Sequence, residues 1–120
     1  MVSKLRAQRI ADRLREEFAE LLVYQISDPR LAGVSVTDVT VDRELAFAEI
    51  YVSAVEGAER SQEVLEALEH AQGFIRKELS HQVELRSFPR LRFHWDPTNE
   101  RADHIERLLA SLKKDEQVGS

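Results

Sequence analysis

The feature that most constrains the fold is a helical pattern that is interrupted by a glycine and followed by a strand pattern. Between residues 64 and 79, apolar side chains recur at helical spacing: Val64, Leu65, Leu68, Ala71, Ile75 and Leu79. Gly73 lies inside this pattern, where a glycine costs about 1 kcal/mol relative to alanine. A kink in the helix at Gly73 would explain that cost. The alternative is that Gly73 only permits close packing.

A break at Gly73 would have a chemical consequence. The backbone N–H groups from Phe74 onward would lack intrahelical acceptors, and free N–H groups at a helix start attract anions. Arg76 and Lys77 would then lie in the first turn of the new helix, where the dipole disfavours cations. This placement favours a phosphate between them and the helix end, whereas the alternative is that both cations are simply solvated.

The remaining elements follow from periodicity and turn signals. Residues 2–26 predict an amphipathic helix that ends at the Asp28-Pro29 turn. Residues 34–41 and 46–54 alternate as strands of an antiparallel hairpin, with a phase shift that predicts a bulge near Asp38. Ser61 is the predicted N-cap of the broken helix. In residues 90–95, apolar side chains alternate with cationic ones, so the cations should lie on the open face of the sheet or at its rim. A last helix carries one further apolar stripe: Ile105, Leu108, Leu109 and Leu112.

This order of elements predicts an α+β domain with a three-stranded sheet and helices on one face, which would bury every apolar stripe. We expect a single domain in residues 1–113 and a short flexible C-terminal tail in residues 114–120. The arrangement is similar to the KH domains, which clamp a nucleic-acid backbone with a GxxG loop between two helices. This chain has no GxxG and carries Ala71-Gln72-Gly73 at the corresponding junction.

Charge is distributed unevenly along the 120 residues, although the net charge of −5 argues at face value against nucleic acid. One basic cluster lies at the start of the first helix, at Lys4, Arg6, Arg9, Arg13 and Arg15. A second lies between the helix break and the third strand, at Arg76, Lys77, Arg86, Arg90 and Arg92. These clusters either face a polyanion or are solvated surface. The absence of cysteine excludes disulfides and thiolate metal sites. No segment has the length of a membrane span, which favours an intracellular soluble protein.

Several motifs together resemble the bacterial ribosome-binding factor A family. They are Arg9-Ile10, Asp28-Pro29-Arg30, Val36-Thr37-Asp38-Val39, Ala48-x-Ile50-x-Val52-Ser53, Ala71-x-Gly73-x-Ile75-Arg76, Pro89-x-Leu91-x-Phe93 with Asp96, and Ile105-x-x-Leu108-Leu109. The resemblance implies a type II KH-like fold in which the Ala-x-Gly kink stands in for GxxG. It implies binding to the small (30S) ribosomal subunit and its 16S rRNA in the cytoplasm during late maturation. Processing of the rRNA 5′ end and growth at low temperature are also implied.

The expected RNA-binding residues are Lys4, Arg6, Arg9, Arg13, Arg30, Ala71, Gln72, Gly73, Arg76, Lys77, Arg86, Arg90 and Arg92. Further candidate partners are ribosomal proteins and an assembly GTPase. We expect a monomer with no cofactor, metal or membrane partner. Members of the family often have a more basic C-terminal extension, whereas this chain ends in acids soon after Lys114.

The sequence suggests two other classes of function. An enzyme is disfavoured, because the four histidines accompany no phosphate loop, nucleophile elbow or His-Glu-x-x-His pattern. His94-x-Asp96 together with His104 could be imagined as a set of metal ligands. A protein-binding adapter could instead use the acidic band from Glu56 to Glu69, with Phe47 and Tyr51 as an exposed aromatic pair. Another KH-like RNA-binding module is a further alternative.

Overall fold

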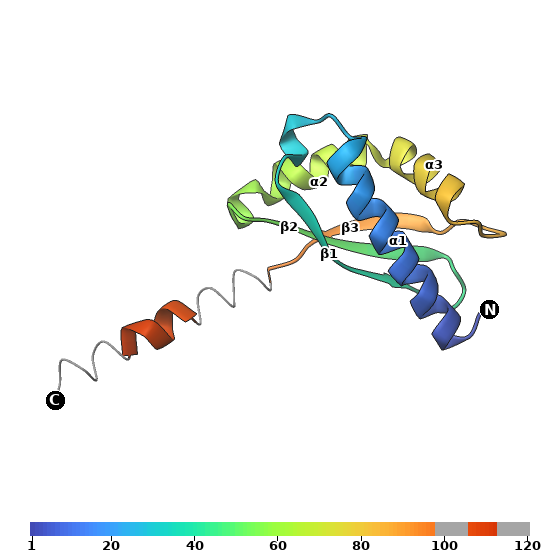
Figure 1. Cartoon of the computed structure of the whole chain (residues 1–120), viewed down its shortest axis with the longest axis horizontal. Coiled ribbons are helices and arrows are strands. Elements are labelled where there is room, and N and C mark those ends of the chain that lie inside the picture. Colours follow the sequence, from blue (N-terminus) through green and yellow to red (C-terminus); the bar gives the residue numbers. More distant parts are fainter. Residues whose placement is uncertain (98–105, 113–120) are drawn as a thin grey trace.

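Three strands form one sheet, and helices cover one of its faces (Figure 1). The computed structural model describes residues 1–97 and 106–112. Its elements are α1 (Lys4–Tyr24), η1 (Pro29–Leu31), β1 (Val34–Val41), β2 (Phe47–Ala54), η2 (Ala58–Arg60), α2 (Ser61–His70), α3 (Gln72–Gln82) and β3 (Arg90–Trp95), where η denotes a short 3-10 helix. The predicted α+β, KH-like architecture is confirmed.

The sheet is mixed, with β2 in the centre. β1 pairs antiparallel with β2, and the register shifts between Val36 and Asp38, so the predicted hairpin and bulge are confirmed. β3 pairs with β2 in parallel, with Leu91 opposite Ala48 and Phe93 opposite Ile50. Parallel neighbours need a long crossover, which α2 and α3 supply. The two helices therefore return the chain to the edge of the sheet.

The core lies between the sheet and the helices. Ile50 in β2 is fully buried, as are Phe18 in α1 and Leu68 in α2. The rings of Phe18 and Phe93 lie 6.1 Å apart and join α1 to β3. Side chains at alternate positions of a strand point to opposite faces, so burial of Leu91 and Phe93 turns the β3 cations outward. The predicted placement of those cations on the open face is confirmed.

The start of α2 differs from the prediction, because Ser61 is not its N-cap. Ser61 has helical dihedrals (φ −56°, ψ −45°), and Arg60 occupies the cap position without a capping side-chain hydrogen bond. The reason is η2, which runs directly into α2 and leaves no extended residue between them. At α1, by contrast, Ser3 Oγ accepts a hydrogen bond from the Arg6 N–H at 3.0 Å. This serine is an ordinary N-cap.

The last apolar stripe is not buried, which corrects the expectation that the sandwich covers every stripe. Residues 106–112 are helical, but Leu108, Leu109 and Leu112 are 52, 53 and 59% exposed. The core is complete without them, because α1, α2 and α3 already cover the inward side chains of the sheet. Ile105 and the predicted flexible tail at 114–120 lie outside the described residues. No helix in the described ranges is long and apolar enough to cross a membrane.

Candidate nucleic-acid interface

The crossover helix is broken at Ala71, two residues before the predicted position. Ala71 has φ −88° and ψ 0°, which ends α2 at His70 and starts α3 at Gln72. These dihedrals lie in the bridge region, which any L-residue can adopt, so the break does not need a glycine. The side-chain amide of Gln72 then donates to the Leu91 carbonyl at 2.9 Å and ties the junction to β3.

Gly73 is helical rather than strained, and it does not pack closely. Its φ is not positive, and a Cβ built on it would meet no atom within 4 Å. Both explanations offered by the sequence for this glycine, a break at Gly73 itself and close packing, are therefore wrong. What the glycine does is leave the outer surface of the first turn of α3 as bare, exposed backbone.

The first turn of α3 presents free hydrogen-bond donors at this surface. The first bond that reaches back from α3 runs from the Ile75 N–H to the Ala71 carbonyl at 2.9 Å. The N–H groups of Gln72, Gly73 and Phe74 have no hydrogen-bond acceptor among the described residues, and no side chain caps them. Gly73 and Phe74 are exposed. Three unpaired donors at the positive end of a helix dipole suit a phosphate group.

Arg76 and Lys77 lie in the second turn of α3 rather than in its first, because the break comes earlier than predicted. Arg76 donates from Nη2 to the Phe88 carbonyl at 3.0 Å, and its guanidinium carbon lies 5.6 Å from the centroid of the Phe88 ring. Its charge is therefore drawn toward the loop before β3. Lys77 is exposed, and its ammonium has no ion-pair partner in the described chain.

Arg30, from the loop after α1, also reaches the helix junction. Its Nη2 lies 3.3 Å from Nδ1 of His70, the last residue of α2. Asp28 holds the Arg30 guanidinium at 2.8 Å and also caps η1 through the Arg30 N–H at 2.9 Å. The hydrogen bond from the Arg30 side chain, followed by that from its backbone, lowers the pKa of Asp28. Arg30 is thus placed beside the break, but its charge is already partly balanced.

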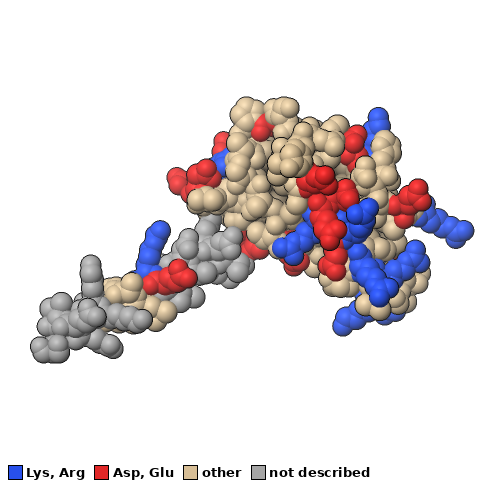
Figure 2. All heavy atoms as spheres, in the orientation of Figure 1, with Lys and Arg blue, Asp and Glu red and all other residues tan. Residues whose placement is uncertain are grey.

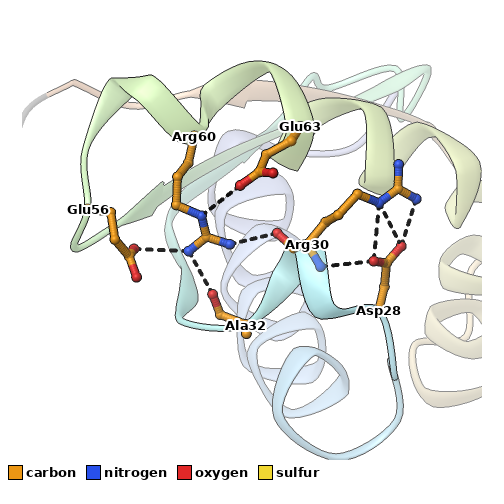
Figure 3. A network of polar contacts seen from close by, with 6 residues as sticks. All are labelled: Asp28, Arg30, Ala32, Glu56, Arg60 and Glu63. Carbon is orange, nitrogen blue, oxygen red and sulfur yellow. Dashed lines mark hydrogen bonds and ion pairs between the residues drawn. The ribbon is translucent and has the colours of Figure 1, made fainter.

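Arg60, which the sequence analysis did not single out, fixes the loop that carries Arg30 (Figure 3). It donates to the carbonyls of Arg30 and Ala32, both at 2.8 Å. It also pairs with Glu56 at 2.9 Å and Glu63 at 3.0 Å, and its side chain is only 15% exposed. The spacing of these two acids around Arg60 indicates the ion pairs, but contacts with carbonyls 28 and 30 residues away have no local signal.

The basic start of α1 forms a second cluster at the other end of α3. Lys4, Arg6 and Arg9 are exposed and have no side-chain partner in the described ranges. Arg13 forms an i, i+4 ion pair with Glu17 at 2.8 Å and also reaches the carbonyl of Gln82, the last residue of α3, at 3.4 Å. In Figure 2 blue atoms gather on the side of the molecule where α1 begins.

The two basic regions do not form one continuous surface. Between them lies a hollow of about 160 Å³, lined by Glu17 and Glu20 of α1 and by Glu78 of α3. The eleven residues of α3 span about 16 Å, which sets the approximate distance from Arg13, at the end of α3, to the break. A polyanion that contacts both regions must therefore pass over or around a patch of negative charge.

The cations of β3 lie apart from both regions, on the open face of the sheet. The Arg92 guanidinium stacks on Phe47, 3.9 Å from the ring centroid, and pairs with Glu49. His94 Nε2 also contacts Glu49, at 2.5 Å. Partial burial would raise the pKa of Glu49, but the hydrogen bonds from His94 and Arg92 outweigh it and lower that pKa. Arg90 is exposed and has no side-chain partner in the described chain, whereas Arg92 is paired with Glu49. Of the two arginines, Arg90 is therefore the one whose charge is not balanced.

Arg86 lies on the loop between α3 and β3 and joins the α1 cluster. It lines a hollow together with Arg6 of α1 and Arg43 of the turn between β1 and β2. Arg43 was not among the expected binding residues, because no local sequence pattern indicates this contact. Of the imagined metal ligands, His104 lies outside the described residues, and no cluster of three potential ligands exists within residues 1–97 and 106–112.

Comparisons with known proteins bear on this arrangement. The sequence profile described as "Ribosome-binding factor A" matches residues 6–109. The chain belongs to the ribosome-binding factor A family. A ribosome-binding factor A from Clostridium botulinum is 41% identical over 116 residues, which cover 96% of this chain and 97% of the relative.

Solved structures show the same fold. The crystal structure of ribosome-binding factor A from Thermus thermophilus superposes with a TM-score of 0.66 at 27% identity, covering 74% of this chain and 93% of that one. A homology model of the Thermus thermophilus factor, fitted into a cryo-EM map of a 30S complex, gives a TM-score of 0.63 at 27% identity. The superposition covers 77% of this chain and 96% of the fitted model's chain.

Proposed function

We propose that this protein binds the small ribosomal subunit through its 16S rRNA and acts during late maturation of that subunit. Membership of the family supports this, as does the 30S complex recorded for the Thermus thermophilus relative. Action in the cytoplasm, a part in processing the rRNA 5′ end and a role in growth at low temperature belong to the same proposal. The protein would act as a monomer without catalysis or a cofactor, beside ribosomal proteins and an assembly GTPase.

The observation that carries the proposal is the bare first turn of α3. The N–H groups of Gln72, Gly73 and Phe74 are free in the described part of the chain. Gly73 has no side chain to cover them, and the space beside it is open. Arg30 lies next to this turn, and Lys77 extends from the following turn. A backbone phosphate of RNA could approach these donors closely, because donors at a helix start recognise phosphate without reading sequence.

The start of α1 would supply the second contact. Lys4, Arg6 and Arg9 have no competing ion pairs among the described residues, so phosphates would not have to displace carboxylates. Arg13 would contribute less, since Glu17 holds it. The acidic hollow between the two regions favours two separate phosphate contacts, as on a folded RNA, over one continuous strand.

The alternative of a protein-binding adapter finds less support in the acidic band. Glu56 and Glu63 are tied to Arg60, so part of the band's charge is used inside the molecule. The predicted aromatic pair is also engaged, because Phe47 lies under Arg92 and Tyr51 stacks on His94 with ring centroids 5.0 Å apart.

Co-sedimentation tests the proposal. The full chain is mixed with mature small subunits, with precursor small subunits and with large subunits at two salt concentrations. We expect binding to small subunits, strongest to precursors and weaker at higher salt, and little binding to large subunits. Equal binding to both subunits would overturn specificity for the small one. Salt-sensitive binding to isolated ribosomal proteins, with none to assembled subunits, would favour the adapter.

A further inference from the structure

A hollow of about 410 Å³ lies where three segments far apart in the sequence meet. Its lining includes Arg6 at the start of α1, Arg43 and Leu45 in the turn between β1 and β2, and Leu85 and Arg86 in the loop before β3. This volume lies within the range of roughly 300–1,000 Å³ that is typical of small-ligand pockets. The hollow is separate from the bare turn of α3.

The walls of the hollow are held in place by hydrogen bonds to the backbone. The Val2 N–H donates to the Arg43 carbonyl at 2.8 Å, and Arg43 Nε donates to the Val2 carbonyl at 3.1 Å. The Asp42 carboxylate accepts the N–H groups of Ala46 and Phe47, both at 2.9 Å. Leu45 has a φ of 57°, in the left-handed region, and is half-buried against the core. The turn therefore presents a fixed conformation before any ligand arrives.

The charge of the hollow is strongly positive. Three guanidinium groups line it, and the acid among its lining residues is Glu44. Arg6 and Arg86 have no side-chain partner in the described chain. Arg43 donates through Nε, and within residues 1–97 and 106–112 neither of its terminal nitrogens has a partner. A guanidinium binds phosphate through two parallel N–H donors, so three of them at one rim favour a phosphate-bearing ligand.

The floor of the hollow is apolar. Leu45 and Leu85 are half-buried and pack on the core cluster, leaving part of each side chain toward the hollow. A simple inorganic anion would use the arginines but leave this floor uncovered. A nucleotide satisfies both, with its phosphate on the arginines and its base against the leucines. A base that is paired in a duplex cannot turn away from its partner to reach the floor.

We propose that this hollow takes one unpaired nucleotide of single-stranded RNA, bound by Arg6, Arg43 and Arg86 with its base against Leu45 and Leu85. The inference deepens the proposed function and rests on it. It adds a base-sized pocket beside the phosphate contacts of α1, because Arg6 belongs to both. The protein would then distinguish an unstacked strand from a duplex at this point.

The experiment compares two kinds of variant on two RNA probes. Arg43→Gln removes a charge, whereas Leu45→Asn removes part of the apolar floor with a residue that tolerates positive φ. Leu85→Asn repeats the second change on ordinary backbone, in case Leu45→Asn unfolds. The probes are a fluorescent 12-nucleotide oligouridylate and a 12-base-pair RNA duplex, and binding is followed by anisotropy over a salt series. Arg15→Gln, an exposed arginine of α1 outside the hollow, is the charge-matched control.

The outcomes separate charge from base binding. Arg43→Gln should reduce the slope of log affinity against log salt by about 0.7 on the single strand. Leu45→Asn and Leu85→Asn should weaken single-strand binding about fivefold at unchanged slope and leave duplex binding unchanged. Arg15→Gln should change neither. Folded leucine variants that bind the oligouridylate like the wild type would overturn the proposal, as would equal losses on the duplex.

Competition and sedimentation complete the test. Uridine monophosphate should displace the oligouridylate better than inorganic phosphate does at the same ionic strength. Equal displacement would overturn the assignment of a base to the floor. If the wild-type protein co-sediments with small subunits but the substitutions in the hollow leave RNA binding unchanged, the hollow alone is refuted. Wild-type protein that fails to co-sediment would refute the proposed function.

Discussion

Arg60 Nη2 donates to the backbone carbonyl of Arg30 at 2.8 Å, so a residue at the start of α2 holds the loop that leads to the helix break. The same guanidinium also donates to the Ala32 carbonyl at 2.8 Å. These contacts explain how a loop with a proline and an exposed glycine keeps the Arg30 side chain beside His70. Arg60 therefore holds the backbone on both sides of Leu31, and we expect it to position Arg30 rather than to contact RNA itself.

Replacing Arg60 tests this positioning role. Arg60→Met keeps most of the side-chain length but removes both hydrogen bonds to carbonyls. We expect the free energy of unfolding to fall by about 2 kcal/mol, because bonds from a charged donor are lost from a mostly buried position. Affinity for small subunits should fall as well, because Arg30 loses its support. Urea unfolding and co-sedimentation measure the two effects.

Glu56→Gln is the matched control for Arg60. It breaks one ion pair of the same network, but the Glu56 side chain is 54% exposed. Exposed pairs contribute at most about 1 kcal/mol, so stability should change little and binding should be unaffected. If Arg60→Met is no less stable than Glu56→Gln, the carbonyl contacts of Arg60 do not stabilise the loop.

Asp28 gives stability a defined dependence on pH. Its pKa is lowered in the folded protein by the Arg30 side chain and then by the Arg30 N–H. The stabilisation is therefore fully present above the unfolded-state pKa, near 3.8. It is lost as the pH falls through the lower pKa of the folded state. Asp28→Asn should be less stable than wild type at neutral pH, and the difference should shrink as the pH falls below about 4.

Urea unfolding of both proteins from pH 2 to pH 7 measures this difference. A gap that stays constant down to pH 2 would mean that the charge of Asp28 contributes nothing and that only its shape matters. A gap that widens on acidification would contradict the direction of the pKa shift. Either outcome would remove the charge of Asp28 from the account of how Arg30 is positioned.

The fold could largely be predicted from the sequence, because strand and helix periods differ and each apolar stripe needs a partner. The hairpin, the bulge near Asp38 and the outward cations of β3 all followed from alternation. The position of the helix break did not, because Ala71 makes the turn with dihedrals that have no residue signature. The exposed stripe of residues 106–112 was also unpredictable, since periodicity indicates an apolar face but not what covers it.

The candidate site was predictable in its charges but not in their pairing. Arg92 was expected to bind RNA, yet Glu49, 43 residues away in sequence, holds it on the open face. Such partners arise only when the strands align, so no local pattern shows them. Arg43 was missed for the same reason, because a hairpin turn brings it beside Arg6 and Arg86 only in the folded chain. Long-range contacts therefore decide which cations stay free.

The start of α1 should dominate the salt dependence of subunit binding. Changing Arg6, Arg9 and Arg13 together to glutamine removes three cations, two of which are unpaired in the described chain. We expect weaker binding and a slope of log affinity against log salt that is smaller in magnitude by about 2, since each lost phosphate contact accounts for roughly 0.7–0.9. Co-sedimentation with small subunits over a salt series measures the slope.

Arg92→Gln serves as the control for this triple change. It removes a cation that Glu49 already balances on the open face, so the slope should stay the same. The triple variant will also lose the Arg13–Glu17 pair, which contributes only a few tenths of a kcal/mol on a helix surface. An unchanged slope in a folded triple variant would show that α1 does not contact the polyanion.

Gly73 allows stability and binding to be changed in opposite directions. A side chain at this position meets open space, and Gly73 has no positive φ, so Gly73→Ala should stabilise folding by up to about 1 kcal/mol. Gly73→Asp should stabilise as well, because a carboxylate at the positive end of α3 is favoured by the helix dipole. Both variants should nevertheless bind small subunits more weakly, measured by co-sedimentation beside thermal unfolding.

The two substitutions separate crowding from charge at the same backbone position. Alanine only covers the approach to the free N–H groups, whereas aspartate also repels a phosphate, so Gly73→Asp should bind more weakly than Gly73→Ala. Gln62→Asp is the matched control, since Gln62 is the second residue of α2 as Gly73 is of α3. It adds the same charge at a helix start away from the break, and binding should not change. Full affinity in Gly73→Asp would mean that no phosphate lies at the start of α3, leaving the arginines of α1 to carry the RNA contact.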